Sequence, residues 1–95
     1  MGQRNIKESA VLIGFSPEGK CVYSEIVSLH DYWDGEHVWD SGAKIKKIRL
    51  VRLRGYLFDA KGHLLQEFES NFDLMTGTYQ KGWNRHADGT FIEHQ

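Results

Sequence analysis

Short runs of strand-favouring residues alternate along this chain with a recurring four-residue phrase that begins with a polar residue and ends in glycine. The phrase occurs as Ser16-Pro17-Glu18-Gly19, Asp59-Ala60-Lys61-Gly62 and His86-Ala87-Asp88-Gly89. A type I turn followed by a glycine in the left-handed conformation has this composition and joins antiparallel strands. The pattern therefore predicts three β-hairpins, and a fourth turn is expected between Asp73 and Gly77.

These turns divide the chain into about six strands, while helical periodicity is weak. The predicted strands are Glu8–Phe15, Lys20–Ser28, Lys44–Phe58, His63–Phe72, Thr78–Arg85 and Thr90–His94. One short helix has room at Ser28–Asp34, because Asp34-Gly35 and Ser41-Gly42 interrupt any longer helix in that region. The sequence predicts an all-β fold, an antiparallel β-meander forming a curved sheet or a partly open barrel. We expect a flexible N-terminus over residues 1–7 and a single β domain over 8–95.

The segment from Lys44 to Phe58 changes the phase of its apolar positions midway. Ile48 and Leu50 alternate with Arg49, whereas Leu53 and Leu57 fall on the opposite face from Leu50. A β-bulge at Val51-Arg52 inside one long strand would produce this change. The alternative is a sheet that is apolar on both faces and is covered by another layer or subunit.

Composition limits the class of protein without indicating a function. The chain has 95 residues, a formal charge of -1 and one cysteine, which excludes an intramolecular disulfide and is typical of one folded domain. Cys21 is predicted in mid-strand as a small buried residue rather than a nucleophile. With no apolar run long enough for a membrane helix, we expect a cytoplasmic protein without a cofactor.

The near-zero net charge conceals a basic segment. Residues 44–54 contain six Lys and Arg and no acid. One interpretation is a phosphate-binding strand, whose candidate residues are Lys46, Lys47, Arg49, Arg52 and Arg54. The sequence favours the alternative, in which Glu67 and Glu69 of the second hairpin neutralise part of this charge across the strands.

Residues 30–42 are the acidic counterpart, and they combine acids with histidines and large aromatic residues. His30, Asp34 and His37 could contribute metal ligands, or an Asp-His pair could perform acid–base chemistry, but no metal-binding or catalytic spacing is present. The aromatic residues Tyr32, Trp33 and Trp39 could line a ligand cleft or a protein interface. The alternatives are a solvated loop for the polar residues and a cap on the open sheet for the two tryptophans.

Taken together, these features favour binding over catalysis. The sequence predicts an interaction module that acts as a homodimer or small homo-oligomer and recognises a protein or small ligand through this aromatic and acidic loop. The proposed contact residues are Tyr32, Trp33, Trp39, His30, His37 and Asp34. Nucleic-acid binding through residues 44–54 is the first alternative. A small hydrolase or metal-dependent enzyme using His30, Asp31, Asp34 and His37 is the second, although no residue is assigned as catalytic or metal-binding.

Overall fold

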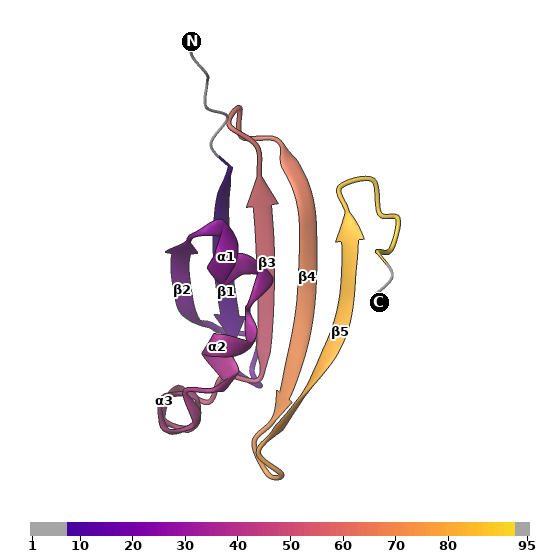
Figure 1. Ribbon diagram of the computed structural model, residues 1–95. Helices are drawn as coiled ribbons and strands as arrows, with labels where there is room; N and C mark the ends of the chain where they lie inside the picture. Colours follow the sequence, from indigo (N-terminus) through magenta and orange to yellow (C-terminus); the bar gives the residue numbers. More distant parts are fainter. Residues whose placement is uncertain (1–7, 93–95) are drawn as a thin grey trace.

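The computed structural model describes residues 8–92, and within them five strands form one antiparallel sheet (Figure 1). The strands are β1 (Ser9–Phe15), β2 (Cys21–Val27), β3 (Arg52–Phe58), β4 (Leu64–Asp73) and β5 (Thr78–His86). Three short helices lie between β2 and β3 in the chain: α1 (Leu29–Trp33), α2 (Glu36–Trp39) and α3 (Gly42–Ile48). The mainly β, antiparallel character predicted from the turns is therefore confirmed.

Each predicted turn phrase forms a turn, and its final glycine has the expected positive φ. The angles are 83° at Gly19, 87° at Gly62 and 93° at Gly89, values that cost glycine little because it has no Cβ. The turn after Asp73 also forms, with the Gly77 amide donating to the Asp73 carbonyl at 2.8 Å.

The third turn is followed by a single bridge between Arg85 and Phe91 rather than by the predicted strand Thr90–His94. Residues 1–7, predicted to be flexible, and the end of that strand lie outside the described residues. The described part of the sheet therefore has five strands where the sequence predicted about six.

The strand order is β2-β1-β3-β4-β5, so the prediction of a meander is wrong. In a meander β3 would pair with β2, but here it pairs with the opposite edge of β1. The chain between β2 and β3, residues 28–51, is long enough to cross over β1, and a crossover of a dozen or more residues permits this order. The sheet stays open, with β2 and β5 at its edges, so the partly open barrel is also wrong (Figure 1).

Helix α3 replaces the first half of the predicted long strand. Ile45 and Ile48 are three residues apart, the spacing that places both side chains on one side of a helix, and Ile45 is buried against the sheet. Arg49 ends the helix in the left-handed conformation, with φ 58°. The change of phase near residue 50 therefore marks a helix-to-strand boundary, and the predicted bulge at Val51-Arg52 is wrong.

Helix α1 confirms the one short helix expected at Ser28–Asp34. The Ser28 hydroxyl accepts a hydrogen bond from the Asp31 amide at 3.1 Å and so caps the first turn. The helix ends at Trp33 with Asp34 as its C-cap, and Gly35 is the N-cap of α2, so the chain breaks where the sequence indicates. Helices α2 and α3 were not predicted, so the expectation of a single short helix is wrong.

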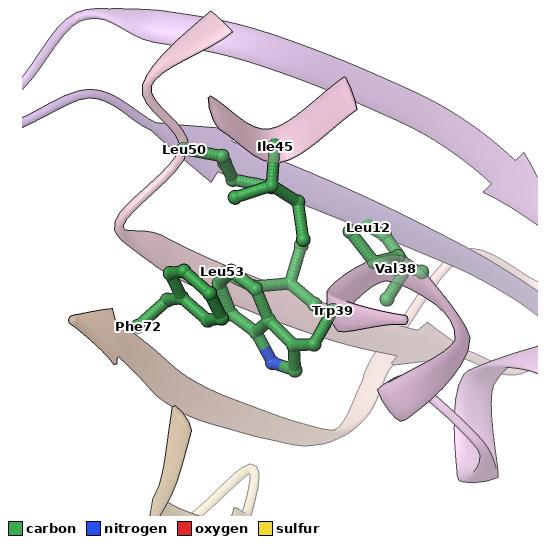
Figure 2. Packing of buried hydrophobic residues seen from close by; sticks show 7 residues of the cluster. All are labelled: Leu12, Val38, Trp39, Ile45, Leu50, Leu53 and Phe72. Carbon is green, nitrogen blue, oxygen red and sulfur yellow. The ribbon is translucent and has the colours of Figure 1, made fainter. Parts of the chain in front are cut away.

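The two faces of the sheet differ because only one is covered by the helices. In β1 and β3 every second residue is buried, and these residues face α1–α3. The main core lies in this layer, where Trp39 of α2 packs beside Phe72 and above Leu53 (Figure 2). Its buried residues are Leu12, Val38, Trp39, Ile45, Leu50, Leu53 and Phe72.

Cys21 departs from its prediction. Cys21 is exposed because it is the first residue of the edge strand β2, directly after the turn at Gly19, and not a residue in the middle of the strand. Within residues 8–92, no helix has the length and apolar character needed to cross a membrane.

Candidate ligand-binding cleft

A cleft of about 290 Å³ lies between the α1–α2 segment and the β4–β5 hairpin, on the helical side of the sheet. Its lining includes all three tryptophans of the chain and three further aromatic residues. The aromatic lining consists of Tyr32, Trp33, Trp39, Phe68, Tyr79 and Trp83. A concave site with apolar walls and a few polar groups is the usual form of a small-molecule binding site.

Trp39 forms the deepest part of the wall and is held from three directions. Its ring stacks on Phe72 at 5.4 Å between ring centres and on Tyr79 at 6.2 Å. Its indole N–H donates to the Ser70 hydroxyl at 2.9 Å. Trp39 is 4% exposed, so it belongs to the core as well as to the cleft, as the interpretation of a capping tryptophan expected.

Trp33 and Tyr32 are adjacent on α1 but play different parts. Helical geometry turns Tyr32 toward the sheet, where it is 2% exposed, and leaves Trp33 at the rim, 55% exposed. The two rings meet edge to face at 5.0 Å, and Tyr32 contacts Phe68 in the same way at 5.4 Å. Trp33 is therefore not a capping residue, and the two tryptophans that the sequence treated alike have different surroundings.

Phe68 forms the floor of the cleft because two glycines leave space for its ring. A Cβ atom built on Gly55 would lie 2.0 Å from the Phe68 ring, and one built on Gly35 would lie 2.9 Å from it. Neither distance is compatible with a real side chain. Gly55 in β3 and Gly35 between α1 and α2 thus allow the ring to lie between sheet and helices.

Two buried oxygen atoms of lining residues have no hydrogen-bond partner among residues 8–92. They are the hydroxyl of Tyr32 and the side-chain carbonyl of Asn84. Burial raises the pKa of Tyr32, and the negative charge of Glu67 raises it further, so this hydroxyl stays protonated. A buried polar atom without a partner is unfavourable, and a ligand that reached it could satisfy it.

The mouth of the cleft carries charge of both signs, with acid in excess. Glu36 of α2 and Lys81 of β5 face each other across it, with 3.4 Å between carboxylate oxygen and ammonium nitrogen. Burial and the negative charges of Glu36, Asp40 and Asp34 raise the pKa of Tyr79. The acidic loop predicted from the sequence therefore imposes a negative potential on one wall of the cleft.

The polar candidates of the acidic loop, all within the described residues, are not gathered into a metal-binding group. His30 is exposed on α1, and Asp34 serves as the C-cap of that helix. A ring nitrogen of His37 lies 2.7 Å from the Asp34 carbonyl oxygen, and the other lies 3.9 Å from the Glu25 carboxylate. Within residues 8–92 no three His, Cys, Asp or Glu side chains are grouped to hold a metal ion.

The basic candidates are divided between two elements. Lys46 and Lys47 lie on α3 and Arg49 at its end, where it pairs with Glu18 at 2.9 Å. Arg52 and Arg54 lie on β3, so these five residues do not form one basic strand. Arg54 pairs with Glu69 at 2.8 Å, as the cross-strand alternative predicted, while Glu67 pairs instead with Arg85 of β5 at 3.3 Å.

Apart from Gly35 and Glu36 at the start of α2, the lining residues that the sequence analysis did not name as candidates come from β4 and β5. Phe68, Tyr79, Lys81 and Asn84 lie far from the acidic loop in the chain, and strand pairing brings them together. Tyr79 lies opposite Phe72 in the β4–β5 hairpin, which a correct alignment of the turn at Asp73–Gly77 would have indicated.

Comparison of the chain with protein-family models, curated proteins and solved structures found no match.

Proposed function

We propose that the protein is a binding module for a small, partly aromatic ligand, which occupies the cleft between the α1–α2 segment and the β4–β5 hairpin. The observation that supports this proposal is the gathering of five aromatic side chains from four elements around one concavity, while the ring of the sixth lining residue, Trp83, lies beside Arg54 and Arg85 on the other face of the sheet. Aromatic side chains at a solvent-accessible wall provide large contact areas at low cost in conformational entropy. Trp33 in particular is more than half exposed, so its large apolar ring is available for contact with a ligand.

The dimensions of the cleft limit the ligand. A volume of 290 Å³ lies near the lower end for small-molecule sites and holds roughly ten non-hydrogen atoms, at about 30 Å³ for each. A single aromatic ring with a short polar side chain has this size. A ligand this small is expected to bind with a dissociation constant near 1 mM.

Binding of 2-phenylethanol, a neutral probe of this size, tests the proposal by NMR. Saturable shifts of the indole N–H signals of Trp33 and Trp39 are expected, because both rings line the cleft. In Trp33→Ala the affinity should fall at least about threefold while the dispersed spectrum of a folded protein persists. Phe91→Ala is the matched control, since Phe91 is an exposed aromatic residue that does not line the cleft. The absence of saturable shifts at 20 mM probe (about twenty times the expected constant) would refute the proposal.

We further propose that a second copy of the chain covers the open face of the sheet, giving the homodimer expected from the sequence. This face carries Val11 of β1 and Tyr56 of β3, and their neighbour Ile26 on β2 is 82% exposed. Arg54 and Glu67 flank Tyr56 on the same face, and each is paired with an opposite charge, Glu69 and Arg85. Two copies related by a two-fold axis would bring the apolar residues together with these ion pairs at their rim. The radius of gyration of 14.4 Å exceeds the roughly 12 Å of a compact domain of this length, which leaves unusually much surface to cover.

The two alternative functions gain no comparable support. The basic residues that would bind nucleic acid lie on separate elements, and two of them pair with Glu18 and Glu69. The residues proposed for a hydrolase lie apart on α1 and around α2. The observations favour the cleft over both.

A further inference from the structure

We infer that the cleft selects a cationic ligand, specifically an aromatic ring joined by a short chain to a protonated amine. This inference rests on the proposed function and deepens it by naming the chemical class of the ligand. Three features support it: the aromatic lining, the excess of acid around the mouth, and the lack of hydrogen-bond donors at two buried oxygens.

The faces of aromatic rings carry partial negative charge and attract cations at close range. Two of the lining rings, Trp33 and Tyr32, meet edge to face at 5.0 Å on the α1 side of the cleft. On the β5 side of the cleft, the Tyr79 ring stacks nearly parallel to the Trp39 ring. A bound ammonium group would therefore meet rings from both α1–α2 and β5.

The fixed charges around the cleft favour the same sign of ligand. Of the charged lining residues, Glu36 and Lys81 form an ion pair across the mouth, and the Glu69 carboxylate pairs with Arg54 on the other face of the sheet. Asp34 and Asp40 lie close enough for their charges to act on Tyr79 as well. The guanidinium groups of Arg54 and Arg85 lie over the Trp83 ring on the other face of the sheet, where they pair with Glu69 and Glu67. Because Lys81 is paired with Glu36, the charges of Asp34 and Asp40 leave this side of the cleft negative, which disfavours an anionic ligand.

Both buried oxygens without partners can accept a hydrogen bond from a ligand. The Tyr32 hydroxyl and the Asn84 carbonyl can each accept a hydrogen bond, and neither receives one from residues 8–92. A primary ammonium has three N–H donors and no acceptor. It can donate to both atoms, whereas a carboxylate could accept only from the Tyr32 hydroxyl and would leave the Asn84 carbonyl unpaired.

Three probes of similar size and different charge test the inference: phenethylammonium, 2-phenylethanol and phenylacetate. Dissociation constants can be measured from the tryptophan fluorescence of the whole chain, since two of its three tryptophans, Trp33 and Trp39, line the cleft with their rings. Phenethylammonium is expected to bind about fivefold more tightly than 2-phenylethanol at low salt, and phenylacetate more weakly than either. The preference for the cation should decrease as salt is added, because added ions screen partly exposed charges.

Charge variants test the cause through the ratio of ammonium to alcohol affinity within each protein. Glu36→Gln should lower this ratio about threefold, and Lys81→Met should raise it by a similar factor. The opposite directions matter because a general loss of structure would not produce them. Glu18→Gln is the matched control: it removes a paired surface acid on the β1–β2 turn, outside the cleft, and should leave the ratio unchanged.

The outcomes separate this inference from the proposed function. If the alcohol binds as tightly as the ammonium, or phenylacetate binds best, the cleft is a binding site but the inferred charge selectivity is wrong. A ratio that moves in the same direction in Glu36→Gln and Lys81→Met would also overturn it. If none of the three probes binds, the proposed function fails together with the inference.

Discussion

Replacing Trp39 measures how far one residue serves both the core and the cleft. Removal of a buried tryptophan side chain costs about 3–5 kcal/mol of unfolding free energy. The environment of Trp39 places Trp39→Ala in the upper part of that range, because its ring stacks on Phe72 and Tyr79 and its N–H bonds to Ser70. Domains of this size have a total stability of about 5–15 kcal/mol, so the variant retains only a fraction of it.

Urea unfolding followed by circular dichroism provides the measurement. With an m-value near 1 kcal/mol/M for a domain this small, Trp39→Ala should lower the midpoint by roughly 4 M. Trp39→Phe keeps an aromatic ring but removes the donor to Ser70 and leaves a small void, and it should lower the midpoint by roughly 1–2 M. The phenylalanine variant keeps the measurement possible if the alanine variant does not fold.

Trp33→Ala is the control, since Trp33 is 55% exposed and its main ring contact is the edge of Tyr32. It should cost about 1 kcal/mol or less. If Trp39→Phe and Trp33→Ala shift the midpoint equally, or Trp33→Ala shifts it more, the assignment of Trp39 to the core and Trp33 to the rim is wrong.

Three further predictions address other parts of the structure. Gly55→Ala should displace the Phe68 ring, which should lower the unfolding free energy by about 2 kcal/mol or more and weaken probe binding. Gly19→Ala is the control: it changes a turn with open space around it, so it should cost about 1 kcal/mol and leave probe binding unchanged. Ile26→Glu should convert a dimer near 22 kDa to the 11.0 kDa monomer, as measured by light scattering after size exclusion. A wild-type protein that is monomeric at about 100 µM, well above the dissociation constant of a typical dimer, would contradict the proposed dimer. Hydrogen bonds from backbone amides of the β3–β4 turn lower the pKa of Asp59. Its ionised carboxylate therefore stabilises the fold at neutral pH, and this effect is lost as pH falls through the lowered pKa. The thermal midpoint of wild type should exceed that of Asp59→Asn at pH 7, and the difference should shrink below about pH 4. A difference that is constant with pH would contradict the last prediction.

The turns could be predicted from the sequence because their chemistry is local. The phrase ending in Gly62, for example, contains both the residue that accepts the turn's amide bonds and the residue that adopts positive φ. The same holds for α1, whose Ser28 cap and Asp34-Gly35 end are both visible in the sequence. Strand order is not local: the pairing of β3 with β1 depends on the path of residues 28–51 over the sheet.

Helix α3 was missed because its seven residues contain three lysines and only two isoleucines at helical spacing, and because Arg49 and a hydrophobic strand follow it. Arg49 in the left-handed conformation gives no warning, since glycine or asparagine is the usual residue there. At the candidate site, the aromatic residues of the acidic loop were identified, but their partners Phe68 and Tyr79 depend on strand register and on the position of the loop above β4. Sequence patterns alone therefore identify one wall of the cleft and not the other.

The position of a bound ligand tests the central claim most directly. NMR of the protein saturated with phenethylammonium should show intermolecular nuclear Overhauser effects between the probe and the side chains of Trp33, Phe68 and Tyr79, which surround the cleft. The predicted result is a set of contacts from both walls at once. Contacts confined to Val11 and Tyr56 on the open face of the sheet, or none at saturation, would contradict the account.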